Sequence, residues 1–442
     1  MVNGRWSMVN GRWSIQSGFE LGSEPASVGP RLLDSLRAPS TIDHRPSTYH
    51  VPSPTKILQS IQPYVFTTLI AKKRALEAQG ITVLDLSLGS PDQPMPPALI
   101  EAIGEAAKDT KSHGYPHMTG ETAFHEAFAA FMQRRFGVIL DIPAEVVPVA
   151  GAKEGLANLV AAYCEPGDAM MITDVSYPVY ERAVAASGAD LIRMPVRAED
   201  SYWPDLSAIS AHDAKRAKFL LVNFPNNPTG AVTTRERLAE AVDYCREHDI
   251  ILISDLAYSE LVQTGERAPS VFEIAGSKEV AIEIHSGSKN FSMAGMRLGV
   301  VCGRRDVMAA LNSYRTLVGY GVPTIVQRAG TFAFNNAEEL SAVIREGYRE
   351  RFAAAVAGFA DAGVTVTPPT AGMYLWIPVP PGTTDWEVTE RLLAEEHIVI
   401  TPGSGFGPGG AGYVRISLVA PPDVLRAACR RAAAPWVTAG IA

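Results

Sequence analysis

Two hydrophobic patterns alternate along most of the chain. Short continuous apolar runs, typical of buried strands, occur at 146–150, 169–173, 219–222, 250–253 and 298–301. Segments with apolar residues three and four positions apart, which predict helices, include 121–136, 152–163 and 234–248. Strands that alternate with helices of this length favour βαβ units, a mainly parallel sheet and hence an α/β fold.

The pattern differs towards both ends of this region. Residues 64–79 have helical spacing, and residues 81–88 predict a strand before the turn Gly-Ser-Pro-Asp that begins at Gly89. Further helices are predicted at 96–107, 305–314, 323–334 and 338–362. Short strands are then expected at 364–367, 373–378, 398–400 and 413–417, together with helices at 385–396 and 422–433.

The first 54 residues are expected to form a disordered or loosely draped arm. The heptad Met-Val-Asn-Gly-Arg-Trp-Ser occurs twice in succession at residues 1–14. This repeat is too short for a solenoid and lacks the apolar core of a secretory signal. Residues 15–53 are rich in Ser, Pro and Gly with scattered charges, a composition that does not favour a packed core.

Composition narrows the class of protein. With 442 residues and 47% hydrophobic content, the chain is long enough for two or three domains. The net charge of −8, with both signs mixed along the chain, disfavours a nucleic-acid partner. The longest apolar runs are shorter than the roughly 18–20 residues that span a membrane, so no membrane partner is expected.

The cysteines indicate a reducing compartment. Four are present, far apart and without metal-ligand spacing: Cys164, Cys245, Cys302 and Cys429. We expect them to be buried free thiols of a cytoplasmic enzyme, and we expect no metal site.

Candidate chemistry gathers where the predicted strands end. Asn227, Asp255 and Lys289 all follow such strands, and ligands of open α/β sheets bind beyond the carboxyl ends of the strands. One crevice can therefore hold all three side chains. Gly151-Ala-Lys-Glu-Gly, between a strand and a helix, can cradle a phosphate with its free N–H groups. Gly151 allows the backbone to approach such an anion closely.

Three ordered segments give these residues a context. Asn223–Gly230 reads Asn-Phe-Pro-Asn-Asn-Pro-Thr-Gly, and Ser254–Tyr258 reads Ser-Asp-Leu-Ala-Tyr. Ser286–Gly299 reads Ser-Gly-Ser-Lys-Asn-Phe-Ser-Met-Ala-Gly-Met-Arg-Leu-Gly. In this order the segments resemble the pyridoxal-phosphate (PLP) aminotransferases of fold type I, over roughly residues 55–434. The last segment and the Gly151 turn are most similar to the LL-diaminopimelate branch, which is close to the alanine and aromatic aminotransferases.

The resemblance implies an architecture and an activity. It implies a large domain at 94–325, with a mainly parallel seven-stranded sheet sandwiched by helices. It also implies a small α+β domain built from 55–93 and 326–442. The implied reaction moves an amino group between an α-amino acid and a 2-oxo acid through a Schiff base of pyridoxal 5'-phosphate with Lys289.

The resemblance also implies roles around the cofactor. Lys289 moves the substrate proton, Asp255 pairs with the ring nitrogen, and Asn227 and Tyr258 bind the phenolate oxygen. Tyr177 stacks on the ring, although Val175 stands where the family often has proline. The phosphate ligands are the amides of Ala152 and Lys153 with Ser286, Ser288 and Arg297.

Three further residues are implied in substrate binding or assembly. Arg415, in Val-Arg-Ile-Ser, binds the substrate carboxylate with Asn227, and the backbone at Gly89 lines the substrate pocket. Tyr115 reaches the neighbouring subunit's phosphate, which implies a homodimer with shared active sites.

Several of these residues also fit a purely structural role, and other functions remain possible on the same scaffold. Lys153 and Arg415 can be solvated charges, Tyr115 and Tyr177 locally packed tyrosines, and Gly89 part of an ordinary turn. A β-lyase, a decarboxylase or an amino-acid oxidase uses the same scaffold. A non-catalytic regulator is disfavoured, because the first ~50 residues are too short and too rich in Pro and Gly for a helix-turn-helix domain.

Overall fold

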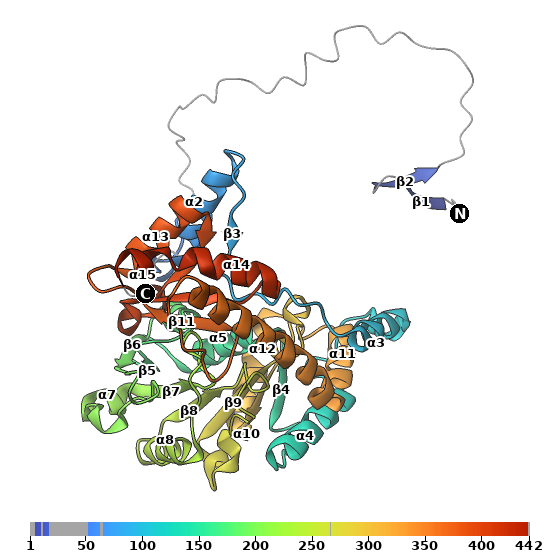
Figure 1. Cartoon of the computed structure of the whole chain (residues 1–442). Coiled ribbons are helices and arrows are strands. Elements are labelled where there is room, and N and C mark those ends of the chain that lie inside the picture. Colours follow the sequence, from blue (N-terminus) through green and yellow to red (C-terminus); the bar gives the residue numbers. More distant parts are fainter. Residues whose placement is uncertain (1–4, 10–11, 17–51, 62–64, 266, 441–442) are drawn as a thin grey trace. The chain divides into compact units, whose positions relative to one another are not determined.

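The computed structural model of the chain describes residues 5–9, 12–16, 52–61, 65–265 and 267–440 (Figure 1). The chain divides into two compact units, Met1–Ser53 and Pro54–Ala442. Most of the predicted arm at 1–54 lies outside the described residues. Within it, strands β1 (Arg5–Val9) and β2 (Arg12–Gln16) pair antiparallel, with Ser7 opposite Ser14, the last residues of the two heptad copies.

A seven-stranded sheet forms the centre of the second unit, in the order β4-β10-β9-β8-β7-β5-β6. Strand β10 alone runs opposite to the other six strands of this sheet, which confirms the predicted mainly parallel architecture. The strands are β4 (Val146–Val149), β5 (Ala169–Thr173), β6 (Asp190–Met194), β7 (Ala217–Asn223), β8 (Ile251–Asp255), β9 (Ala281–Ser286) and β10 (Gly299–Gly303).

The sequence predicts no range for β6 or for β9, although it predicts a strand before Lys289. The side chains of β6 are mostly half-buried, and polar Glu283 and His285 interrupt the apolar run of β9 although both are buried. Continuous hydrophobicity therefore identified only the strands whose two faces are both apolar.

Helices cover both faces of the sheet (Figure 1). Val301 of β10 packs in a core with α5 and α10, whereas its neighbours Val300 and Cys302 pack in a core with α4 and α11. This alternation is the normal two-residue period of a strand. The helices around this sheet are α3 (Pro97–Lys108), α4 (Thr122–Phe136), α5 (Ala152–Tyr163), α6 (Val179–Ser187), α7 (Ala211–Arg216), α8 (Arg235–Glu247), α10 (Arg305–Val318) and α11 (Thr324–Asn335).

A second, antiparallel sheet has the order β11-β14-β13, and β12 pairs separately with β3 in parallel. Its strands are β3 (Leu84–Asp85), β11 (Tyr374–Pro378), β12 (Ile398–Val399), β13 (Thr401–Pro402) and β14 (Tyr413–Ser417). The surrounding helices are α1 (Lys56–Ser60), α2 (Val65–Glu77), α12 (Ala337–Asp361), α13 (Asp385–Glu396), α14 (Pro422–Ala432) and α15 (Ala434–Thr438). A Thr384–Glu387 capping box begins α13 where the sequence predicts its start.

Two predicted strands differ from the structure. No strand forms at 364–367 in the described chain, although Val364 and Val366 are buried with exposed neighbours. The Val364 amide instead bonds to the Phe359 carbonyl at the end of α12, so the alternation reflects burial without a partner strand. The strand expected at 81–88 is ordered as a strand only at Leu84–Asp85.

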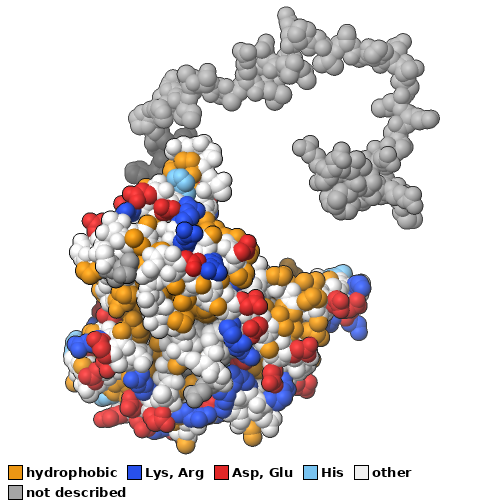
Figure 2. Space-filling model, in the orientation of Figure 1, with side chains coloured by type: hydrophobic (Ala, Val, Ile, Leu, Met, Phe, Trp, Pro, Cys, Tyr) orange, Lys and Arg blue, Asp and Glu red, His pale blue; other side chains and the backbone are white. Residues whose placement is uncertain are grey.

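The expectations drawn from the cysteines, the mixed charges and the length of the apolar runs can be compared with the structure. All four cysteines are buried and free, and burial raises the pKa of Cys164 and of Cys429 to about 12. Lys and Arg side chains are interspersed with Asp and Glu over the visible face (Figure 2). Among the described residues, no helix is long and apolar enough to cross a membrane.

Candidate active site

A cavity of about 550 Å³ lies at the carboxyl ends of β7, β8 and β9. We call it the strand-end cavity. It is lined by the three side chains predicted to share a crevice, Asn227, Asp255 and Lys289. The other predicted site residues that line it are Gly89, Ala152, Lys153, Tyr177, Tyr258, Ser286, Ser288, Arg297 and Arg415. Of the predicted site residues, Tyr115 alone does not line it.

Asp255 is the last residue of β8, and its carboxylate is buried. Oδ2 accepts a 2.7 Å hydrogen bond from the Tyr180 hydroxyl, and Oδ1 accepts one of 3.0 Å from the Ala257 amide. Burial raises the pKa of Asp255, whereas these two hydrogen bonds oppose the rise. The protein therefore orients a desolvated carboxylate that a cationic partner would stabilise.

Lys289 lies on the short helix α9 (Gly287–Asn290), directly after β9. Its ammonium Nζ donates a hydrogen bond to the Gly89 carbonyl. Burial, with the nearby charges of Arg415 and Arg297, lowers the pKa of Lys289 to about 7. A large share of neutral amine is therefore present near neutral pH, as a nucleophile or a proton acceptor requires.

Arg415 of β14 is only 2% exposed, so the interpretation as an exposed arginine is wrong. Nη1 donates to Asn227 Oδ1 at 2.9 Å, and Nη2 donates to the Ser87 carbonyl at 2.5 Å. The guanidinium also lies over two aromatic rings, 4.2 Å from the centroid of Tyr374 and 4.6 Å from that of Phe406. These contacts hold a permanent cation in the cavity wall.

An anion-binding arrangement surrounds the start of α5. Gly151 precedes the helix with φ +92°, and a Cβ there would approach Arg297 Cζ to 3.0 Å. The N-cap of α5 is Gly151, which offers no side chain, so the first amides of the helix are free of a side-chain cap and can face an anion. On the adjacent turn, Ser286 Oγ accepts a 3.2 Å hydrogen bond from the Ser288 amide.

The two predicted aromatic contacts have different surroundings. Tyr177 lines the cavity and packs edge-on against Tyr180, with 5.7 Å between ring centroids. Tyr115 is 82% exposed and stacks on Tyr320 at 4.5 Å.

Sequence reasoning missed three side chains of this site. Tyr180 bonds to Asp255, Tyr374 bonds to Tyr258, and Asn223 Oδ1 accepts the Asn227 amide at 3.0 Å. Tyr180 could have been found, because it follows Tyr177 by three residues at the start of a helix, where such neighbours share a face. Tyr374 could not, because its position depends on how β11 pairs with β14.

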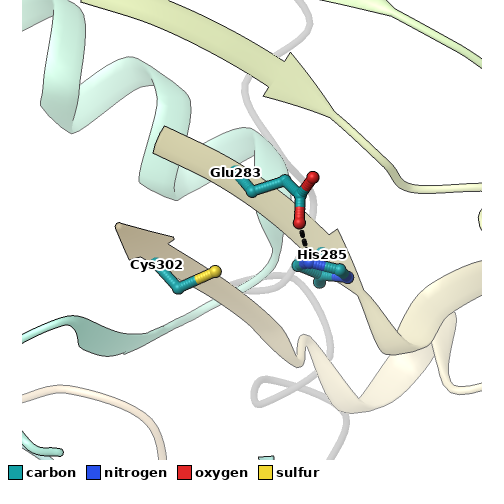
Figure 3. A group of neighbouring side chains, drawn as sticks. All are labelled: Glu283, His285 and Cys302. Atoms are coloured by element: carbon teal, nitrogen blue, oxygen red, sulfur yellow. Dashed lines mark hydrogen bonds and ion pairs between the residues drawn. The ribbon is translucent and has the colours of Figure 1, made fainter. Parts of the chain in front are cut away.

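A second polar cluster, separate from the cavity lining, consists of buried Glu283, His285 and Cys302 (Figure 3). Their ligand atoms lie within 4.8 Å of one another, and Cys302 stands opposite Glu283 in the β9–β10 register. Glu283 already accepts hydrogen bonds from Ser270 Oγ at 2.9 Å, the Val271 amide at 2.8 Å and His285 Nε2 at 3.0 Å. These bonds satisfy the carboxylate within the protein, and the expectation of no metal site stays a prediction.

The cavity matches the functional groups of pyridoxal 5'-phosphate. The Gly151 turn with Arg297 suits a phosphate, Asp255 suits a protonated ring nitrogen, and the Lys289 amine suits an aldehyde. Together with the seven-stranded sheet, this donor set defines a PLP-dependent enzyme of fold type I. A family model for aminotransferase class I and II matches residues 81–431, and the chain belongs to that family.

Known relatives agree with this assignment. LL-diaminopimelate aminotransferase 2 of Trichormus variabilis is 41% identical over 378 residues, 85% of this chain and 97% of the relative. A probable N-succinyldiaminopimelate aminotransferase from Thermus thermophilus is similar in structure, with a TM-score of 0.78, 36% identity and coverage of 84% of this chain and 100% of that one. Substrate-bound BacF from Bacillus subtilis has a TM-score of 0.83, 31% identity and coverage of 86% and 97%. The chain is thus a PLP-dependent aminotransferase that transfers amino groups between amino acids and oxo acids.

Proposed function

We propose that Lys289 carries the cofactor and moves the proton during transamination of an α-amino acid held by Arg415. The supporting observation is that a lysine of lowered pKa, a buried carboxylate and a buried arginine line one cavity. When bound, PLP withdraws electrons from the substrate α-carbon and so makes its proton removable. With the cofactor bound, the neutral amine of Lys289 would be the group that takes up this proton and gives it back during the transfer.

The remaining side chains orient and tune these groups. Asp255, held by Tyr180 and the Ala257 amide, pairs with the protonated ring nitrogen and gains the cationic partner that its burial requires. Asn227 and Tyr258 hydrogen-bond the phenolate oxygen, while Tyr177 covers a ring face. The amides of Ala152 and Lys153, with Ser286, Ser288 and Arg297, bind the phosphate.

Arg415 selects substrates that carry an α-carboxylate. Its planar fork of donors matches the two carboxylate oxygens, and burial excludes the water that would otherwise compete. The Gly89 backbone is proposed to line this subsite, since Gly89 lines the cavity and its carbonyl contacts Lys289.

We propose LL-diaminopimelate as the first amino donor to test, since the curated relatives with 34–41% identity bear that name. In a half-reaction screen, the purified holoenzyme is mixed with single amino acids, and loss of absorbance above 400 nm is followed. Diaminopimelate should react faster than alanine, phenylalanine or aspartate. A faster reaction with one of those three would replace this donor assignment and leave the proposed role of Lys289 unchanged.

We also propose a homodimer with shared active sites. Tyr115 and Tyr320 form an exposed aromatic pair, and Leu317 and Val318 on the adjoining segment are 80% and 60% exposed. Exposed apolar side chains grouped in this way favour a protein interface.

The predicted division into domains at 93 and 325 is retained as a proposal. Its support is that the seven-stranded sheet falls within 94–325, whereas the strands of both smaller sheets of the second unit fall outside that range. A cytoplasmic location is likewise proposed, supported by the four buried free thiols.

Covalent trapping tests the central assignment. Borohydride reduction of the holoenzyme, followed by peptide mapping, should place the pyridoxyl label on Lys289. Lys153 is the informative comparison, because it lines the same cavity. Label on Lys153, or on neither lysine, would remove Lys289 from its proposed role.

A further inference from the structure

Tyr374 links the two halves of the strand-end cavity. This residue begins β11, is 2% exposed and lines the cavity. Its hydroxyl lies 2.9 Å from the Tyr258 hydroxyl, on the side assigned to the cofactor. Its ring lies 4.2 Å from the guanidinium carbon of Arg415, on the side assigned to the substrate carboxylate. One side chain thus contacts both binding functions.

The direction of the Tyr258–Tyr374 hydrogen bond follows from a count of hydrogens. Each phenol has one hydrogen to donate. If Tyr258 donates its hydrogen to the phenolate oxygen of the cofactor, as proposed above, the bond between the two tyrosines must be donated by Tyr374. The Tyr374 hydroxyl then fixes the orientation in which Tyr258 can serve the cofactor, and it polarises that donor.

The ring of Tyr374 has a separate effect on Arg415. The guanidinium is stacked against Tyr374 and Phe406 while it bonds to Asn227 and the Ser87 carbonyl. Aromatic faces attract a desolvated cation and restrict its rotamers. The ring therefore holds the fork of Arg415 in position before a carboxylate arrives.

The backbone next to this residue indicates a fixed position for the hydroxyl. A Cβ atom on Gly89 would overlap the Tyr374 hydroxyl and would lie 2.8 Å from Tyr374 Cε1. Only glycine at position 89 leaves room for the phenol, so the turn that contacts Lys289 and the tyrosine that contacts Tyr258 pack directly together.

We propose that Tyr374 is a positioning residue of this aminotransferase, whose hydroxyl directs Tyr258 towards the cofactor and whose ring holds Arg415 for the substrate carboxylate. This inference rests on the roles proposed above for Tyr258 and Arg415. The two contacts use different parts of the side chain, so substitutions can separate them.

Tyr374→Phe tests the hydroxyl, because it keeps the ring. The readout is the pH midpoint of the holoenzyme absorbance above 400 nm. Loss of a hydrogen bond to the ionised phenolate makes protonation easier, so Tyr258→Phe should raise this midpoint and Tyr374→Phe should raise it too. Because Tyr374 acts through Tyr258, the double variant should shift no further than Tyr258→Phe. Tyr177 and Arg415 also face Tyr258 and are unchanged in every variant.

Tyr374→Leu tests the ring. The dissociation constant of α-amino acids in the half-reaction should rise about tenfold beyond that of Tyr374→Phe, whereas carboxylate-free amines should bind as they do to Tyr374→Phe. Tyr374→Met replaces the leucine variant if that one does not fold. An equal loss for amino acids and amines would overturn the proposed effect on Arg415.

Tyr348→Phe is the matched control. Tyr348 is a buried tyrosine of the same core, and its hydroxyl contacts the sulfur of Met373 at 3.7 Å rather than the cavity. Tyr348→Phe should leave the pH midpoint unchanged. If it shifts the midpoint as much as Tyr374→Phe does, the shift reflects a general loss of packing in this core and not the hydroxyl of Tyr374. Two results would refute the inference on Tyr374 while the proposed role of Tyr258 stands. One is a shifted midpoint in Tyr258→Phe with none in Tyr374→Phe, and the other is additive shifts in the double variant. No shift in Tyr258→Phe would refute the proposed role of Tyr258, and this inference with it.

Discussion

The hydroxyl of Tyr180 donates a 2.7 Å hydrogen bond to Oδ2 of Asp255, and both side chains are buried. Hydrogen bonds to a buried carboxylate favour its ionised form, which is the form that can pair with a cationic ring nitrogen. Tyr180, which lies outside the three sequence segments that resemble the family, thus supports the carboxylate of Asp255 at the end of β8.

Tyr180→Phe should therefore weaken cofactor binding. Loss of a hydrogen bond to a charged group costs about 1.5–3 kcal/mol, so the dissociation constant for PLP should rise about tenfold or more. Equilibrium dialysis of the cofactor measures it. Tyr244→Phe is a suitable control, because the Tyr244 hydroxyl is buried on α8 without a hydrogen-bond partner among the described residues. Equal affinity in the two variants would show that the Tyr180 bond does not support Asp255.

Gly151→Ala should damage the phosphate end of the cavity. The added Cβ would crowd Arg297, and φ +92° is strained for alanine. We expect at least a tenfold loss of PLP affinity together with reduced stability. Gly137→Ala separates the two effects, since Gly137 has φ +71° and open space around its Cβ position. That control should lose stability by about 1 kcal/mol and bind PLP normally. Normal PLP binding by Gly151→Ala would argue against this phosphate site.

Arg415→Lys should retain the cofactor absorbance and lose efficiency with amino acids. Lysine cannot reproduce the two-donor fork, and a loss of about 2.7 kcal/mol corresponds to a roughly hundredfold lower kcat/KM. Carboxylate-free amines should be much less affected. Arg349→Lys, at an exposed position of α12, should leave both unchanged. Near wild-type efficiency with amino acids in Arg415→Lys would exclude Arg415 as the carboxylate ligand.

The cofactor-free protein should become more stable as pH rises above neutrality. The pKa of Lys289 falls from an ordinary 10.5 to about 7 on folding. Between these values the unfolded chain holds a proton that the folded chain lacks, so the unfolding free energy rises with pH, by at most about 1.4 kcal/mol per pH unit. Lys289→Met should remove this contribution. Denaturant unfolding at pH 7 and pH 9 measures it, and the same pH slope in both proteins would contradict the lowered pKa.

Mixed dimers test the shared sites. Lys289→Ala and Tyr115→Ala subunits should each be nearly inactive alone. Refolded together in equal amounts, half of the dimers are mixed, and each mixed dimer has one intact site if Tyr115 serves its neighbour. Activity should then recover to about a quarter of the wild-type value. No recovery, with mixed dimers demonstrated by mass spectrometry, would place Tyr115 in its own subunit's site. Full activity of the Tyr115→Ala protein alone would place Tyr115 outside any site.

The sequence predicted the parts of this protein that local pattern determines. Apolar runs located β5 and β8, and the positions of Asn227, Asp255 and Lys289 after predicted strands indicated the cavity that they line. The hydrophobic pattern and the motifs could not predict contacts between residues that lie far apart in the sequence and meet only through strand pairing. Tyr374 reaches Tyr258 across 116 positions because of how β11 packs, and Cys302 meets Glu283 through the β9–β10 register. Residues 364–367 show the opposite error, since alternating burial occurred there without a partner strand.

The bond between Arg415 and the Ser87 carbonyl joins positions 328 residues apart. During synthesis, residues 94–325 can complete the seven-stranded sheet while Ser87 still lacks its partner strands. The β3–β12 pair and the Arg415 contact must wait until the last part of the chain has left the ribosome. Closing contacts of such long range is intrinsically slow. A nascent chain can therefore fold its seven-stranded sheet, with Lys289 directly after β9, before the contact between Arg415 and Ser87 can form. If Arg415 is the carboxylate ligand as proposed, the ability to select an amino acid arises only after the last strands have been synthesised.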